Sequence, residues 1–338
     1  MDDTLDIHRL LRVRTDEAAQ FTPSKRYLGS LPSVDLAYLR AHPEHLPIFR
    51  THQRIRETPI HGGSISAASR LTLDDGTSVF LKTWPEPSSA TSPRDEGAQR
   101  PPGFFEAEAA GLAWLRVDGG APLPEIIIAS TDLIALEWID EGRPTPKSAR
   151  SFGAALATTH SAGAPAFGAD WSGFIGSLPL DNQSTAGPWP TWFAEHRIVP
   201  YLRASSDRGA LSGADVTAVE ELLANIAQYG GDDEPPARVH GDLWPGNLLW
   251  SEEGPVYLID PAAHGGHRET DLAELALFGG APYLDQIRAG YQDVWPLSSG
   301  WEARVPLHQL HMLLVHTTIF GASYRDAVVA AVRATVKQ

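Results

Sequence analysis

The chain has 338 residues, 42% of them hydrophobic, which is enough to bury the cores of two or three structural units. Its 27 basic and 42 acidic residues give a formal net charge of −15, which argues against a nucleic-acid binder, because such proteins need a basic surface for the phosphates. The chain has no cysteine, so disulfides, thiolate metal sites and cysteine nucleophiles are excluded.

The first 50 residues contain no pattern typical of a catalytic or binding site. They begin with acidic residues and lack the apolar segment of a signal peptide, and no run in the chain approaches the roughly 18 apolar residues of a membrane span. Prolines interrupt the two short helical patterns in this part. We therefore expect residues 1–50 to be an N-terminal extension of a cytoplasmic protein.

A strand-rich unit is predicted for residues 51–139. The alternating runs SAASRLTL and TSVFLKTW flank Asp75-Gly76, which is typical of a hairpin turn. Residues 85–103 are rich in Pro, Ser and Gly and predict a loop. FFEAEAAGLAWLR, at 104–116, combines good helix formers with apolar residues at helical spacing, and EIIIAS and LIALEWI predict two further strands.

The chain from 140 to 338 is predicted to be mostly helical. Helices are expected at 147–162, 189–204, 212–229, 270–278, 282–293 and 302–337. The exception is a short hairpin in NLLWSEEGPVYLID. The predicted fold class is therefore α+β, with a small β-rich lobe (51–139) that contains one long helix, followed by a larger, mostly helical lobe (140–338).

Lys82 is the first residue along the chain whose position indicates a functional role. Strand alternation places it on the same face as Phe80, and a cation near apolar surface needs an anionic partner. The helix predicted at 104–116 offers Glu108, which lies on that helix's apolar stripe, and Glu106 is the alternative acid. For Lys82 alone, the alternative is a strand lysine whose ammonium group reaches solvent.

Two other segments of this lobe could contribute to a nucleotide site. Gly62 and Gly63, in IHGGSIS, lie at a turn between strands, where backbone amides can face phosphate oxygens, although such a pair often marks only a turn. LIALEWIDEG runs from a strand into the lobe boundary. In a kinase-like architecture the backbone of Glu137, Trp138 and Ile139 would contact the adenine edge, and the alternative is an ordinary edge strand.

The stretch HGDLWPGN, followed by VYLIDPA, carries the main functional pattern. Asp242 and Asn247 have the Asp-x4-Asn spacing of a kinase catalytic loop. Asn247 and Asp260 offer hard oxygen ligands of the kind that Mg²⁺ prefers, and Asp242 could accept the proton of a substrate hydroxyl. The alternative is a turn in which Asp and Asn side chains bind their own backbone.

The hairpin in this stretch predicts which of these residues meet. With Ser251–Gly254 as the turn, Trp250 is expected opposite Pro255, and Asn247 opposite Leu258. This register brings Asn247 close to Asp260 at the open end of the hairpin. Phosphoryl transfer needs the protein mainly to position groups and stabilise charge, so three such side chains could be sufficient.

Several motifs together resemble the fructosamine kinase (ketosamine-3-kinase) family. They are HGDLWPGN, IDPAAHGGHRETDLAELALFGG and LHQLHMLLVHTTIFGASY, with support from GGSIS and WSGFIGSLPLDN, and the resemblance covers about residues 52–338. The tryptophan after the aspartate loop, DPA and the GHRETDLA context are more specific to this family than the loop itself. The resemblance implies the two-lobed protein-kinase-like fold that is shared with aminoglycoside phosphotransferases.

What the resemblance implies for function is ATP-dependent, Mg²⁺-dependent phosphorylation of the C3 hydroxyl of a ketosamine. The 3-phosphate is unstable and its breakdown frees the amine, so the reaction leads to deglycation. The implied roles are general base for Asp242, Mg²⁺ ligands for Asn247 and Asp260, phosphate anchors for Lys82 and Glu108, phosphate loop for Gly62, Gly63 and Ser64, and substrate binding for Trp244 and His267. For Trp244 the alternative is a purely packing role.

The remaining polar residues of this region are interpreted as structural. We expect Asp271 to be a buried acid that holds the catalytic loop, and the pairs His264/His267 and His308/His311 to be core or surface histidines rather than metal ligands. Only about ten residues separate Asp260 from the next helix, too few for a long activation segment. This argues against a peptide-binding protein kinase, and we expect a small ketosamine or a glycated lysine as the acceptor. We also expect a monomer that binds neither nucleic acid nor a membrane.

Two alternative functions stay open from the sequence. The first is a small-molecule hydroxyl kinase of the aminoglycoside or choline phosphotransferase type, against which Trp244 and GHRETDLA argue. The second is a catalytically silent nucleotide-binding scaffold, against which the complete set of chemical groups argues.

Overall fold

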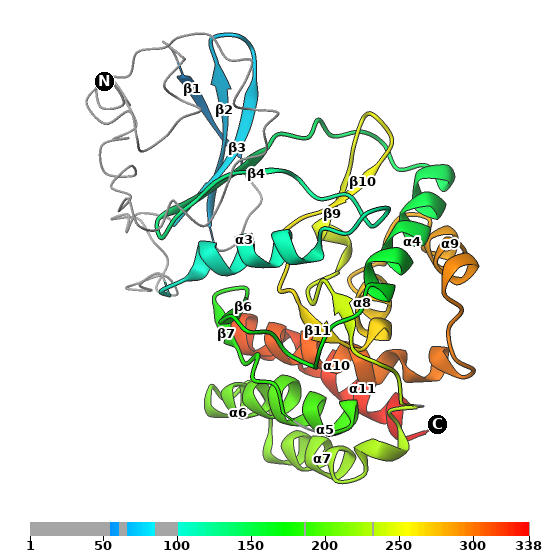
Figure 1. The fold of residues 1–338 in the computed structure, drawn as a ribbon. Coiled ribbons are helices and arrows are strands. Elements are labelled where there is room, and N and C mark those ends of the chain that lie inside the picture. The colour runs from blue at the N-terminus through cyan, green and yellow to red at the C-terminus, as the bar shows by residue number, and fades with distance from the viewer. Residues whose placement is uncertain (1–54, 61–65, 85–100, 186, 232, 338) are drawn as a thin grey trace. The chain divides into compact units, whose positions relative to one another are not determined.

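A computed structural model describes residues 55–60, 66–84, 101–185, 187–231 and 233–337 (Figure 1). The predicted extension 1–50, most of the predicted loop 85–103, and the predicted phosphate loop with Gly62, Gly63 and Ser64 lie outside the described residues. The chain forms two compact units, one from the ranges 1–110 and 124–140 and the other from 111–123 and 141–338. We call them the first and the second unit.

The described part of the first unit is an antiparallel sheet with one helix. Its five strands lie in the order β1-β2-β3-β5-β4. Their bounds are Ile55–Ile60 (β1), Ala67–Leu73 (β2), Ser78–Thr83 (β3), Ile126–Ala129 (β4) and Leu133–Glu137 (β5). The predicted Asp75-Gly76 hairpin is confirmed, since Gly76 has a φ of +89° and Leu73 N–H donates to Thr77 O at 2.8 Å.

Helix α3, Phe104–Leu115, forms where the sequence predicted it. Phe105, Leu112 and Leu115 are fully buried, as the apolar stripe indicated, and Glu108 is buried with them. The boundary between the two units falls inside this helix, after Ala110.

The second unit is mostly helical, so the predicted α+β fold class is confirmed. Its longer helices are α4 Pro146–Ser161, α5 Trp189–Phe193, α6 Val199–Asp207, α7 Gly213–Leu223, α8 Arg268–Glu274, α9 Leu284–Val294, α10 Trp301–Phe320 and α11 Arg325–Val336. The predicted helix 189–204 is interrupted by a π-helical turn, Ala194–Ile198, and the predicted helix 302–337 is broken at Gly321, whose φ is +77°.

Three two-stranded ladders complete this unit. They pair β6 Gly173–Ile175 with β7 Leu178–Leu180, β8 Ala237–Val239 with β11 His264–Gly266, and β9 Leu248–Trp250 with β10 Val256–Leu258. Only the last was predicted. All six strands have three residues, too few for alternation to be recognised in a sequence, and β9 and β10 were predicted from the turn expected at Ser251–Gly254.

The register of the β9–β10 hairpin differs from the prediction by one residue. Trp250 lies opposite Val256 rather than Pro255. Pro255 belongs to the turn, because Ser251 N–H donates to its carbonyl at 3.0 Å, so the turn takes up one residue more than expected. As a result, Asn247 lies opposite Ile259 instead of Leu258, and Ile259 N–H donates to Asn247 O at 3.2 Å.

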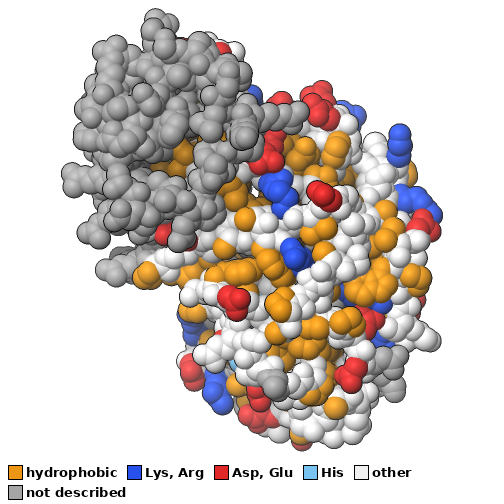
Figure 2. Space-filling view, in the orientation of Figure 1, with side chains coloured by type: hydrophobic (Ala, Val, Ile, Leu, Met, Phe, Trp, Pro, Cys, Tyr) orange, Lys and Arg blue, Asp and Glu red, His pale blue; other side chains and the backbone are white. Residues whose placement is uncertain are grey.

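An apolar core of the second unit lies between α5, α6, α7, α10 and α11, and includes Trp192, Phe193, Ile198, Leu310 and Leu314. Its surface in Figure 2 mixes acidic, basic and hydrophobic side chains, with no gathering of basic ones on the described part of that face. Among the described residues, no helix has both the length and the apolar character needed to cross a bilayer.

Helices α4 and α9 are in backbone contact through two glycines. A Cβ atom at Gly153 would lie 1.9 Å from Ile287 O, and one at Gly290 would lie 1.9 Å from Arg150 O. Real Cβ atoms do not approach so closely, so this helix pair depends on glycine at both positions.

We expect Gly153→Ala to lower the free energy of unfolding by about 1–3 kcal/mol or more, because overpacking forces the helices apart. The control is Gly213→Ala in α7, where a Cβ would meet nothing within 4 Å. Urea denaturation of both variants measures the difference. Equal midpoints for the two variants would contradict this account of α4 and α9.

Candidate active site

Lys82 and Glu108 form a buried ion pair in the first unit. Lys82 Nζ lies 2.9 Å from Glu108 Oε1 and 3.1 Å from Oε2, and the two residues are 6% and 8% exposed. Two charges can be buried at this low exposure because each neutralises the other. The structure thus brings together the strand lysine and the helix acid that the sequence paired, whereas Glu106 is only half-buried. The role of the pair in binding phosphate stays a prediction.

The predicted adenine-contacting segment lies at the end of β5. Glu137 N–H donates to Glu125 O at 2.8 Å, so this amide is used within the sheet. Trp138 stacks under Arg70, whose guanidinium carbon lies 4.4 Å from the ring centroid, and Ile139 follows it outside the strand. That Glu137, Trp138 and Ile139 contact adenine stays a prediction.

In the second unit, Asp271 holds the loop that carries Asp242. Its Oδ2 accepts from His240 N–H at 2.7 Å and its Oδ1 from Gly241 N–H at 2.9 Å, while His160 Nε2 lies 3.0 Å from Oδ2. These contacts hold the pKa of the Asp271 carboxyl below its ordinary value although burial opposes this. The predicted structural role of Asp271 is confirmed.

Gly241 is required at its place in this loop. Its φ is +77°, and a Cβ there would lie 2.5 Å from Ala262 O and 2.8 Å from the His264 ring. The chain can therefore pass close to the segment after Asp260 only because no side chain intervenes.

The segments that carry Asp242, Asn247 and Asp260 are hydrogen-bonded to one another. Asn247 Nδ2 donates to Asp242 O at 2.8 Å, Asn247 O accepts from Ile259 N–H, and His240 Nε2 lies 2.8 Å from Ile259 O. The amide of Asn247 is thereby oriented with its nitrogen toward the loop. Asp260 has a φ of +55°, an uncommon conformation for a residue with a side chain, and such strain clusters at functional sites.

A second acid of α8, Glu274, also contacts this loop. Its Oε2 accepts from Leu243 N–H, one residue after Asp242, at 2.7 Å. Burial and the neighbouring charges of Asp271 and Asp242 raise the pKa of the Glu274 carboxyl well above its ordinary value. No pattern in the sequence singles out this residue.

Trp244 belongs to a cluster of aromatic rings, which we call the aromatic cluster and define as Trp244, Phe278, His316, Phe320 and Tyr324. Trp244 meets Phe278 edge-on at 6.0 Å, and Phe278 lies 4.6 Å from His316, between ring centroids. Phe278 is 42% exposed and has a φ of +52°. The cluster gives the side of this unit that carries Trp244 a partly open aromatic surface.

The aromatic cluster was missed in the sequence except for Trp244. The spacing of four between His316, Phe320 and Tyr324 predicts one helix face and could have indicated it. The position of the Trp244 ring also depends on Gly246, since a Cβ there would lie 2.1 Å from that ring.

His267, predicted to bind substrate, is 2% exposed and begins α8 as its N-cap, accepting from Glu269 N–H at 3.3 Å. Its ring packs on Trp189 and on His308. This position has a structural explanation that needs no ligand, and a contact between His267 and substrate stays a prediction.

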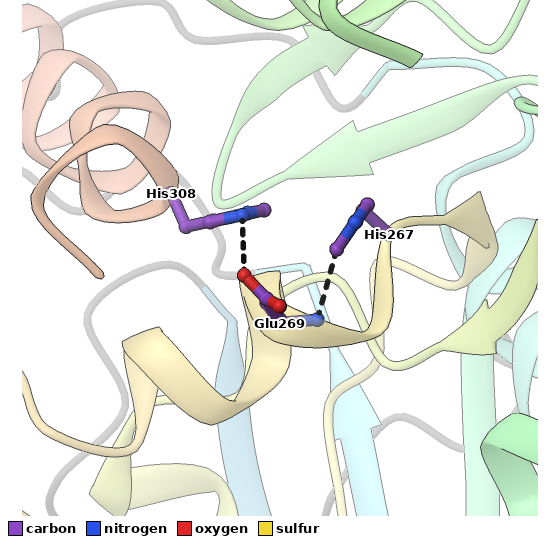
Figure 3. A group of neighbouring side chains, drawn as sticks. All are labelled: His267, Glu269 and His308. Carbon is purple, nitrogen blue, oxygen red and sulfur yellow. Dashed lines mark hydrogen bonds and ion pairs between the residues drawn. The ribbon is translucent and has the colours of Figure 1, made fainter. Parts of the chain in front are cut away.

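Within the described ranges, one group of side chains, His267, Glu269 and His308, comes close enough together to suggest a metal ion (Figure 3). Both oxygens of Glu269, however, accept from Arg304, from Nε at 2.8 Å and from the terminal nitrogen at 2.6 Å. The guanidinium already neutralises this carboxylate and would repel a second cation. We therefore interpret the group as a buried salt-bridge network and not as a metal centre.

Comparisons with known proteins come from both sequence and structure. A family model described as fructosamine kinase matches residues 48–338. A probable ketoamine kinase of Enterococcus faecium is 31% identical over 278 residues, which is 80% of this chain and 91% of that protein. A probable ketoamine kinase of Thermus thermophilus is 32% identical over 82% of this chain and 93% of its own length.

Among solved structures, a candidate fructosamine-3-kinase of Thermobifida fusca is 47% identical with a TM-score of 0.76, covering 85% of this chain and 95% of that one. An aminoglycoside phosphotransferase is 13% identical with a TM-score of 0.54, covering 85% and 97% of the two chains. The likeness to the latter shows a shared fold, and the predicted protein-kinase-like fold is confirmed.

The buried histidines of the second unit predict loss of stability in acid. Burial lowers the pKa of His267 and of His311 to about 3, against an ordinary value of 6.5. Between pH 6.5 and 3 the unfolded chain therefore binds protons that the folded chain does not, so stability falls as the pH falls through this window and is unaffected above it. Each histidine contributes up to about 1.4 kcal/mol per pH unit.

We expect His311→Asn to reduce the loss of unfolding free energy between pH 7 and pH 5 by about 1–2 kcal/mol relative to the unmodified chain. Urea denaturation at both pH values measures it, with the exposed Asp293→Asn as the control that leaves the slope unchanged. If the unfolding free energy of His311→Asn falls between pH 7 and pH 5 as much as that of the unmodified chain, His311 does not have the lowered pKa.

Proposed function

Because this chain belongs to the fructosamine kinase family, we propose that it transfers the γ-phosphate of ATP to the C3 hydroxyl of ketosamines, the products of sugars with lysine or small amines. The observation that carries the proposal is the network that joins Asp242, Asn247 and Asp260 through adjacent backbone segments. It supplies a carboxylate for the acceptor hydroxyl beside oxygen ligands for a cation.

ATP is the proposed donor, and the first unit offers groups to hold it. The ammonium of Lys82, held by Glu108, would contact phosphate oxygens, and the backbone of Trp138 and Ile139 would contact adenine. Gly62 to Ser64 would add amides for the phosphates. The solved aminoglycoside phosphotransferase with this fold has been crystallised with ADP and hygromycin B, which supports a nucleotide in this fold.

Asn247 and Asp260 fit a magnesium ion by the chemistry of their donors. One offers an amide oxygen and the other a carboxylate, and the nitrogen of the Asn247 amide is already used by Asp242 O. Bound there, Mg²⁺ would neutralise negative charge on the phosphates. The left-handed backbone of Asp260 is consistent with a side chain that is held for such a purpose.

Asp242 is the proposed general base. Its carboxylate would accept the proton of the C3 hydroxyl as that oxygen bonds to the γ-phosphorus, and the bond from phosphorus to the bridging oxygen breaks, so ADP leaves. The aromatic cluster would lie along the rest of the substrate, where rings can pack on a sugar face and attract the ammonium of the ketosamine. The unstable 3-phosphate then releases the amine.

The test incubates the chain with Mg·ATP and a panel of fructosamines and ribulosamines and measures ADP release and the position of the new phosphate. We expect Asp242→Asn to lower kcat about 10²–10⁴-fold, because a positioned base contributes that much. The exposed Asp293→Asn is the matched control and should keep the full rate.

Two results would argue against the proposal in different ways. Turnover of an aminoglycoside or choline-like alcohol, with none on any ketosamine, would reject the substrate class. Ketosamine turnover that survives in Asp242→Asn would reject Asp242 as the base.

A further inference from the structure

Two acids of α8, one turn apart, face the same loop. Asp271 and Glu274 are each 0% exposed, and their spacing of three residues places them on one side of the helix. Asp271 takes the amides before Asp242, and Glu274 takes the amide after it. Three backbone N–H groups of this loop are therefore held by a single helix.

The peptide group between Asp242 and Leu243 is bonded at both of its polar ends. Its N–H donates to Glu274 Oε2 at 2.7 Å, and its C=O accepts from Asn247 Nδ2 at 2.8 Å. The N–H of Asp242 itself donates to His240 Nδ1 at 3.3 Å. With the peptide planes on both sides of its Cα held, the direction in which the Asp242 side chain leaves the backbone is fixed.

We propose that Glu274 is a positioning residue for Asp242, because it fixes the peptide plane that follows the proposed base. The inference rests on the proposed function of Asp242. It concerns a residue that touches neither substrate nor nucleotide in that scheme and acts only through the Leu243 amide.

The surroundings of Glu274 favour the uncharged form of its carboxyl. Burial raises its pKa, and the charges of Asp271 on its own helix and of Asp242 in the loop raise it further, while the guanidinium of Arg197, from the π-helical turn, opposes them. On α10, the His311 ring lies 3.0 Å from Arg197 O, and its pKa is low, so it adds no charge near neutral pH.

The raised pKa of Glu274 favours its neutral form, which still accepts the Leu243 amide through a carboxyl oxygen. This neutral form places no second negative charge beside the Asp242 carboxylate. Asp271, with two amides and His160, keeps its charge instead.

The experiment compares Glu274→Gln and Glu274→Leu in the full chain, with Mg·ATP and a ketosamine that the unmodified chain turns over. Glu274→Gln keeps a neutral acceptor for Leu243 N–H, so we expect kcat near the original value at pH 7. Glu274→Leu removes the acceptor, so we expect kcat to fall about 10²-fold while KM for ATP stays within about twofold, as misplacement of a catalytic group does. Glu220→Gln, at an exposed helical glutamate, is the control.

Rescue by the conservative variant distinguishes positioning from a merely structural role. Glu274→Gln should retain the kcat that Glu274→Leu loses, with KM for ATP unchanged in both, and its pH profile of kcat should match that of the unmodified chain wherever Glu274 is uncharged. Hydrogen exchange of the Leu243 amide is the second measurement, and it tests the inference even if Glu274→Leu does not fold. We expect this amide to exchange slowly in both the unmodified chain and Glu274→Gln.

The inference is overturned if Glu274→Leu folds and keeps the original kcat and pH profile while Asp242→Asn is inactive. It is also overturned if Leu243 exchanges rapidly in the unmodified, folded chain. Full activity in Asp242→Asn would instead reject the proposed base, so the two failures can be told apart.

Discussion

The proposed catalytic part of this molecule depends on the hydrogen bonds that the Asp271 carboxylate accepts. It binds two successive backbone amides, His240 and Gly241, and a buried imidazole, His160, so that a helix, a loop and a second helix are joined at one group. Removing it would leave three buried donors without an acceptor, and each costs about 1–3 kcal/mol when unsatisfied. The loop runs from there to Asn247, and the β9–β10 hairpin returns the chain to Asp260 beside it.

The two units stabilise their buried charged groups in different ways. In the first unit Lys82 and Glu108 neutralise each other, so a cation is kept at low exposure by a direct partner. In the second unit two buried acids lie one turn apart on α8, and their hydrogen bonds and neighbouring charges shift their pKa values in opposite directions. Asp271 receives three donors and has a lowered pKa, whereas Glu274 receives one and has a raised pKa. Carboxyls in similar chemical environments can thus take different protonation states, which is a common device near catalytic groups.

The sequence was informative where a pattern is local and periodic. Helical spacing was enough to select Glu108 over Glu106, and one short hairpin was enough to predict that the segments of Asn247 and Asp260 lie side by side. It failed where the outcome depends on a single turn or on distant segments. Pro255 shifted the hairpin register by one residue. The strands β8 and β11 pair segments far apart in the sequence, and three residues each are too few to show alternation. Glu274 and most of the aromatic cluster matter because folding brings α8, α10 and the loop together, which the spacing within any one segment does not reveal.

The most direct test is a crystal structure of the chain with Mg²⁺, a non-hydrolysable ATP analogue and a ketosamine. The account predicts the ion bound by Asn247 and Asp260 oxygens at about 2.1 Å. It also predicts an Asp242 carboxylate oxygen within about 3.2 Å of the C3 hydroxyl. An ion held by other residues, or a ketosamine that presents a different hydroxyl to Asp242, would contradict it.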